Sequence, residues 1–200
     1  MGLLSRIFRK KNHDPVIIVS GLPRSGTSMM MKMLEAGGIE PLTDNLRTPD
    51  DDNPKGYYEF ERVKQLANDK EWLPEAGGKA VKIISALLTR LPPDYPYKVI
   101  FMQREMKEVL ASQKKMLQRK GKTEDAVPDD VMAEKFQKHL REVYQWLESQ
   151  SNIDLLYVKY NKVIEDPERQ IAKINHFLNN ILEFEKMLSI VDRSLYRQRV

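Results

Sequence analysis

A glycine-containing turn between an apolar run and a helical pattern holds residues whose types could bind an anion. The turn is Gly21-Leu22-Pro23-Arg24-Ser25-Gly26-Thr27-Ser28. Such a loop exposes successive backbone N–H groups at the start of a helix, where they and the helix dipole hold an anion. Gly21 and Gly26 let the backbone turn tightly and approach a ligand. Arg24 adds a charged fork for phosphate or sulfonate oxygens, and the Thr27 and Ser28 hydroxyls can donate to the same group.

The spacing of this turn is similar to the Walker A loop, G-x-x-x-x-G-K-[ST], except that Thr27 occupies the place of the lysine. The missing lysine weighs against an ordinary ATPase or GTPase. A plain strand-to-helix turn is the other interpretation. The combination of a strand, spaced glycines, Arg24 and hydroxyl residues favours a phosphate-binding loop.

Strand and helix patterns alternate along the chain, and they must position this loop. Short β-branched or apolar runs predict strands over residues 16–19, 80–84, 98–102 and 153–157. Helical spacing of apolar residues predicts helices over residues 27–36, 61–68, 106–117, 130–148, 166–178 and 182–190. Proline-rich residues 40–56 predict a long loop. The alternation predicts an α/β fold, a three-layer, P-loop-type parallel sheet flanked by helices.

Composition limits the classes of function. The chain has 200 residues, a net charge of +4 and a pI of about 9.1, which suits an anionic ligand without demanding nucleic acid, and we expect no nucleic-acid partner. The absence of cysteine excludes a disulfide framework, a thiolate nucleophile and a Cys-ligated metal. It is compatible with a reducing compartment, and we expect a cytoplasmic protein. No apolar run reaches the roughly 18 residues of a membrane span.

The length fits one domain, which we expect over residues 15–200, after a basic tail over residues 1–14. Residues 1–11 could form a short basic amphipathic helix that makes weak contact with an anionic membrane surface. The alternative is a frayed, solubilising end. We favour the frayed end, because ten residues offer little area to bury.

The loop resembles the 5′-phosphosulfate loop of sulfotransferases that use 3′-phosphoadenosine 5′-phosphosulfate (PAPS). In that family a Pro and a Lys or Arg precede Ser-Gly-Thr-Thr or Ser-Gly-Thr-Ser, and the Arg form is more similar to the tyrosylprotein and bacterial branches. The resemblance implies that the 5′ end of PAPS binds to Pro23, Arg24, Ser25, Gly26, Thr27 and Ser28.

Two further segments carry the resemblance, which covers about residues 15–190. Arg104 ends a predicted strand and Ser112 follows eight residues later, as do the residues that bind the 3′-phosphate in the family. Tyr160 opens a segment similar to the family's Tyr-Glu-Asp-Leu-x-x-Asp-Pro, which implies a place near the adenine. A packed aromatic at a strand end is the alternative for Tyr160.

The resemblance implies sulfuryl transfer from PAPS to a hydroxyl or amine acceptor, with no metal. Arg24 and the loop amides would neutralise charge on the leaving phosphate. Lys82 resembles the family's lysine near the sulfuryl group, but Ile84 stands where cytosolic members carry histidine. Glu59 is our candidate base; a solvated or capping glutamate is the alternative. For His139 and the other histidines we expect surface or core roles.

Other interpretations stay open. One is a P-loop nucleotide kinase or NTPase, and another is a non-catalytic protein that retains the nucleotide site. The adjacent acids Asp50 to Asp52 do not converge, so a solvated loop suits them better than a metal site. The family's glycine-rich cap on the 3′-phosphate is absent, and arginines in residues 194–200 are candidates to replace it. The sequence indicates neither the acceptor nor an oligomeric state.

Overall fold

The computed structural model describes residues 14–44, 58–119, 121 and 127–192. These residues contain a parallel sheet of four strands in the order β2-β1-β3-β4. The strands are β1 (Val16–Gly21), β2 (Ala80–Lys82), β3 (Tyr97–Gln103) and β4 (Ile153–Lys159). The predicted α/β fold with a parallel sheet is confirmed.

Strand β1 lies inside the sheet and is buried along its whole length. Its register determines what lies near the loop that follows it. Val19 pairs with Lys82 of β2, and Gly21 pairs with Met102 of β3. Since carboxyl ends of parallel strands meet at one edge, Lys82 and Arg104 both lie beside the start of the loop.

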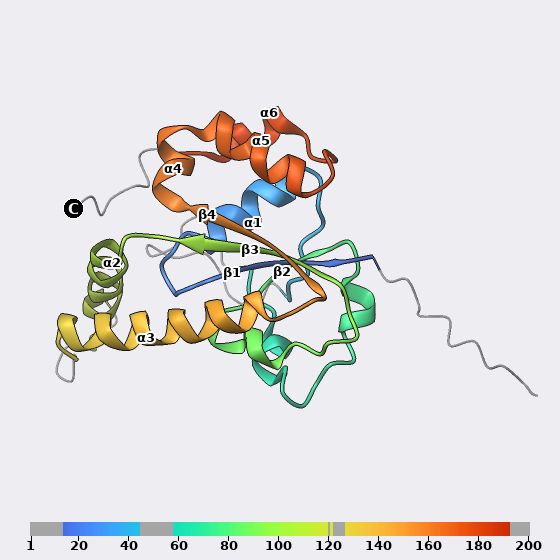
Figure 1. The fold of residues 1–200 in the computed structure, drawn as a ribbon. Coiled ribbons are helices and arrows are strands. Elements are labelled where there is room, and N and C mark those ends of the chain that lie inside the picture. Colours follow the sequence, from blue (N-terminus) through green and yellow to red (C-terminus); the bar gives the residue numbers. More distant parts are fainter. Residues whose placement is uncertain (1–13, 45–57, 120, 122–126, 193–200) are drawn as a thin grey trace, which may run out of the picture.

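Helices cover both faces of the sheet, which confirms the three layers (Figure 1). One face carries α1 (Thr27–Ala36), α4 (Tyr160–Glu165), α5 (Pro167–Phe177) and α6 (Phe184–Ile190). The other carries α3 (Asp129–Glu148) and the 3₁₀ helices η1 (Glu61–Gln65), η2 (Leu73–Ala76) and η3 (Ser85–Arg90). Helix α2 (Met106–Arg119) lies at the end of the sheet to which β3 points.

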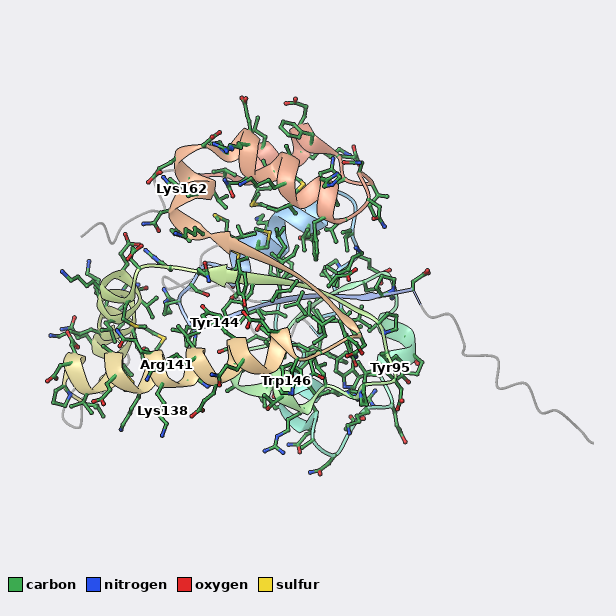
Figure 2. The ribbon with its side chains drawn as sticks, viewed as in Figure 1. Tyr95, Lys138, Arg141, Tyr144, Trp146 and Lys162 are labelled. Carbon is green, nitrogen blue, oxygen red and sulfur yellow. The ribbon has the colours of Figure 1, made fainter. Side chains whose placement is uncertain are left out.

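Two apolar cores follow from the alternation of side chains along the strands. In β1, Ile17 and Val19 pack on the α1 side, whereas Val16 and Ile18 pack on the α3 side. Helix α3 has the matching amphipathic character: Figure 2 shows Tyr144 between α3 and the sheet, and Lys138 on the opposite side of the helix. The cores hold the loop-bearing edge of the sheet in place.

Several predicted elements differ in detail. The helix predicted over residues 61–68 is a short 3₁₀ turn, and β2 ends at Lys82. The additional helix α4 follows β4 directly and was not predicted, because no polar break separates them. Asp166 follows α4 and caps α5, accepting a hydrogen bond from the backbone N–H of Arg169 at 3.3 Å.

Some predictions fall outside the described residues. These are the basic tail apart from Asp14, most of the 40–56 loop with its acidic run, and the C-terminal arginines. Within the described ranges, none of the helices is both long enough and apolar enough to cross a membrane.

Candidate functional site

The predicted phosphate loop connects β1 to α1 through a tight turn. Both the backbone N–H and the hydroxyl of Ser25 donate to the carbonyl of Leu22, at 3.2 and 2.7 Å. Ser25 is buried, so its hydroxyl stabilises the turn from inside. Gly26 caps α1 with a φ of 94°. The helix then begins at Thr27, and its first N–H groups have no intrahelical partner. The loop thus has the form of an anion cradle.

Arg24 sits in this loop with a φ of 72°, a conformation that non-glycine residues seldom adopt. Its Nε donates to Ser112 Oγ at 2.9 Å, and Ser112 is a buried residue of α2. The two residues came from different predicted parts of the site, the loop and the 3′-phosphate pair. The structure brings them into direct contact.

Arg104 joins the same cluster from the end of β3. Its Nη1 donates to the carbonyl oxygen of Arg24 at 3.1 Å, and its guanidinium carbon lies 4.5 Å from the centre of the Tyr160 ring. Tyr160 also lies against the loop: a Cβ added to Gly26 would sit 2.4 Å from Tyr160 Cδ2. The close packing explains why residue 26 must be glycine.

Tyr160 is 6% exposed. This burial raises the pKa of its phenol, and the positive charge of Arg104 opposes that rise. The ring is therefore neutral at physiological pH. It is the first residue of α4, belongs to the core on that face and packs against the loop. Its predicted place near the adenine stays a prediction.

Lys82 and Glu59 form a second cluster on the other side of the loop. Lys82 Nζ donates to Ser28 Oγ at 3.3 Å and lies 3.9 Å from Glu59 Oε1. The side chain of Lys82 is 12% exposed and that of Glu59 is 30% exposed. The carbonyl of Glu59 accepts hydrogen bonds from Thr43 Oγ1 and from the backbone N–H of Asp44, at 2.9 and 3.3 Å. These bonds hold the Glu59 backbone beside the loop.

The remaining predicted residues have simpler positions. Pro23 is exposed in the loop, and Thr27 is the half-buried first residue of α1. Their predicted contacts with a nucleotide stay predictions.

Sequence reasoning missed three residues that contact the site or its supporting elements. Glu108 of α2 accepts from Arg104 Nε at 2.8 Å, and Asn161 Nδ2 donates to Glu108 Oε1 at 3.2 Å. The four-residue spacing of Arg104 and Glu108 was an available signal for this ion pair. Ser85 is the third: its Oγ lies 2.9 Å from His139 Nε2, a contact that links η3 to α3 and that no local pattern indicated.

The geometry can hold an elongated anion. Two guanidinium groups lie at one side of the loop, from Arg24 and Arg104, and the Lys82 ammonium lies at the other. Backbone N–H groups at the start of α1 lie between them. Such fixed donors stabilise charge on phosphate or sulfonate oxygens without having to reorganise.

The strand, loop and helix at the edge of a three-layer parallel sheet define the class: an α/β protein with a P-loop-type anion site. The chain belongs to the sulfotransferase domain family, whose family model matches residues 14–198.

Known proteins agree with this assignment. Sulfotransferase 1A1 of Bos taurus is 29% identical over 120 residues, which are 56% of this chain and 41% of the relative. The match thus spans less than half the length of that curated relative.

Two solved structures share the fold. A sulfotransferase domain from the curacin biosynthetic pathway has a TM-score of 0.54 at 16% identity, covering 90% of this chain and 78% of that one. Mouse sulfotransferase SULT7A1, complexed with PAP, has a TM-score of 0.52 at 17% identity, covering 89% and 62%.

Proposed function

We propose that this protein is a sulfotransferase that moves a sulfuryl group from PAPS to a hydroxyl or amine acceptor. The observation that carries the proposal is that one loop contacts three groups from separate strands and helices. Its Ser28 bonds Lys82, and its Arg24 bonds Ser112 and Arg104. Membership of the family and the PAP bound to one relative support it further.

The residues present fit PAPS by their chemistry. A nucleotide with a phosphate on the 3′ side and another on the 5′ side of its ribose needs two groups of donors. Arg104 with Ser112 forms one group, and Lys82 with Ser28 forms the other. Gly26 carries no side chain beside the loop amides, because a Cβ at that position would collide with the Tyr160 ring. We assign Arg104 and Ser112 to the 3′-phosphate and residues 23–28 to the 5′-phosphosulfate.

PAPS supplies an activated sulfuryl group when it is bound. The chain has two tasks in its transfer, which are to neutralise charge on the leaving phosphate oxygen and to remove the proton of the acceptor. Lys82 and Arg24 perform the first. The Glu59 carboxylate would perform the second, by taking the proton that the acceptor hydroxyl or amine gives up.

A ligand-binding experiment tests the nucleotide. The product that PAPS leaves after transfer, 3′-phosphoadenosine 5′-phosphate (PAP), is expected to raise the melting temperature in the absence of metal. Arg24→Ala is expected to abolish that rise. If ATP with Mg²⁺ stabilised the protein and PAP did not, a P-loop kinase or NTPase would be the better assignment.

A transfer experiment tests the chemistry. Labelled PAPS is offered with a phenol, an aliphatic alcohol, an amine and a monosaccharide. Glu59→Gln should lower kcat about 10²- to 10⁴-fold on whichever acceptor reacts. Glu61→Gln is the matched control, because that nearby exposed carboxylate pairs only with Lys64 among the described residues. PAP binding without transfer to any acceptor would favour a non-catalytic nucleotide-binding protein.

His139 supplies a further comparison within the same assay, because its ring contacts Ser85, three residues after Lys82. If His139→Ala abolished transfer while Glu59→Gln left it intact, the assignment of Glu59 as the base would be wrong.

A further inference from the structure

Glu108 is a buried carboxylate beside the arginine that we assign to the 3′-phosphate. It is 2% exposed and is the one charged residue in the fully buried part of the described chain. A buried charge is tolerated when it is paired and hydrogen-bonded. Both oxygens of Glu108 meet that condition, since Oε2 accepts from Arg104 Nε and Oε1 accepts from Asn161 Nδ2.

The pair with Arg104 determines how the guanidinium is oriented. Glu108 holds its Nε edge at 2.8 Å, the carbonyl of Arg24 accepts from Nη1, and the Tyr160 ring lies 4.5 Å from the guanidinium carbon. These contacts come from α2, the phosphate loop and α4. A planar group held at one edge and along one face has little freedom to rotate, so it needs little further ordering to bind an anion.

The same carboxylate also opposes anion binding, because a negative charge close to a phosphate repels it. Its charge is balanced by Arg104, and Asn161 stabilises it further. The orientation that Glu108 imposes on Arg104 therefore predicts that removing its charge weakens phosphate binding. The repulsion that it exerts predicts that removing its charge strengthens phosphate binding.

We propose that Glu108 is a positioning residue for the 3′-phosphate of the nucleotide and acts through Arg104. This inference rests on the proposed function. Glu108 makes the protein discriminate between nucleotides with and without that phosphate, and the loss of fixed orientation outweighs the relief of repulsion when its charge is removed.

The experiment measures dissociation constants by calorimetry for PAP and for adenosine 5′-phosphate, which lacks the 3′-phosphate. The quantity of interest is the dissociation constant for adenosine 5′-phosphate divided by the dissociation constant for PAP. Glu108→Gln keeps the size of the side chain but cannot accept from both Arg104 and Asn161 as the carboxylate does. We expect it to reduce the ratio at least tenfold, mainly through weaker PAP binding.

Glu105→Gln is the matched control. Glu105 is exposed, lies three residues earlier and undergoes the same change of charge. Its ratio should equal that of the wild type. Arg104→Ala should remove most of the discrimination, and adding Glu108→Gln to it should reduce the ratio no further, because Glu108 acts through Arg104.

A ratio that is unchanged or higher in folded Glu108→Gln would overturn the inference while leaving the proposed function standing. A wild-type protein that fails to bind PAP would overturn the proposed function itself. If Glu108→Gln does not fold, Glu108→Asp tests the same link, because the shorter side chain keeps the charge but withdraws the carboxylate from Arg104 Nε. Loss of discrimination supports the inference, and an unchanged ratio contradicts it.

Discussion

Arg24 Nε and Ser112 Oγ lie 2.9 Å apart although 88 positions separate them in the chain. The bond joins the phosphate loop to the second turn of α2. It therefore makes the two ends of the proposed nucleotide site one structural unit.

The bond should appear as an energetic coupling between its two residues. In a double-mutant cycle of Arg24→Lys and Ser112→Ala, we expect the unfolding free energies to depart from additivity by about 0.5–1.5 kcal/mol. The measurement is urea denaturation of the four proteins. Ser189→Ala serves as the control partner, because exposed Ser189 of α6 bonds through Oγ, among the described residues, only to the carbonyl of Lys186. Its effect should add to that of Arg24→Lys, and equal additivity in both cycles would contradict the prediction.

Gly26→Ala tests the contact between the loop and Tyr160. A side chain there meets both a φ of 94° and a ring atom at 2.4 Å. We expect a loss of stability of more than about 2 kcal/mol, together with loss of PAP binding. Gly78 tests the effect of a positive φ alone, since its φ is 74° and nothing lies within 4 Å of an added Cβ.

Gly78→Ala should therefore cost only about 1–2 kcal/mol and leave PAP binding unchanged. Thermal or urea unfolding with PAP titration provides both measurements. Equal losses in the two variants would show that the contact with Tyr160 contributes nothing.

Lys82→Ala tests the proposed stabilisation of the leaving group. Removing the ammonium beside Ser28 should lower kcat about 10²- to 10³-fold, with a smaller effect on KM for PAPS, because developing charge is greatest in the transition state. Lys82→Arg should retain part of the rate. Lys79→Ala is the control: Lys79 precedes the same strand and pairs with Glu40 at the surface. Full activity of Lys82→Ala would rule out the role.

Tyr97 gives a prediction about stability at high pH. Burial raises the pKa of its phenol, and its hydroxyl donates to the carbonyl of Pro92 at 3.0 Å. An unfolded tyrosine loses its proton near pH 10, whereas folded Tyr97 keeps it. This contribution to stability is complete below pH 10 and is lost as the pH rises above it, by up to about 1.4 kcal/mol per unit.

Tyr97→Phe removes the titration and costs about 1 kcal/mol at pH 8 through the lost hydrogen bond. Urea unfolding of both proteins between pH 8 and 11 should show two stability curves that converge above pH 10. Curves that stay parallel would mean that the phenol ionises equally in the folded and unfolded states.

Much of the fold follows from local patterns. The buried run of β1 and the helical spacing in α1 and α3 are each visible within a few turns of chain, and the structure bears them out. Helix α4 was not predicted, because it is short and follows β4 without a polar break. Residues 61–65 form a 3₁₀ helix and not the start of the predicted α-helix, which the pattern could not distinguish because the two structures share the same apolar spacing over so few residues.

The sequence by itself indicated a phosphate loop, because spaced glycines between a strand and a helix are local features, and its resemblance to the sulfotransferases nominated Arg104, Ser112, Lys82 and Glu59. Only the tertiary structure decided which of these residues touch. The register of β1 with its two neighbours brings Lys82 to Ser28 and Arg104 to the Arg24 carbonyl. The bond from Asn161 to Glu108 likewise depends on α2 and α4 meeting at the sheet edge, which no single segment encodes.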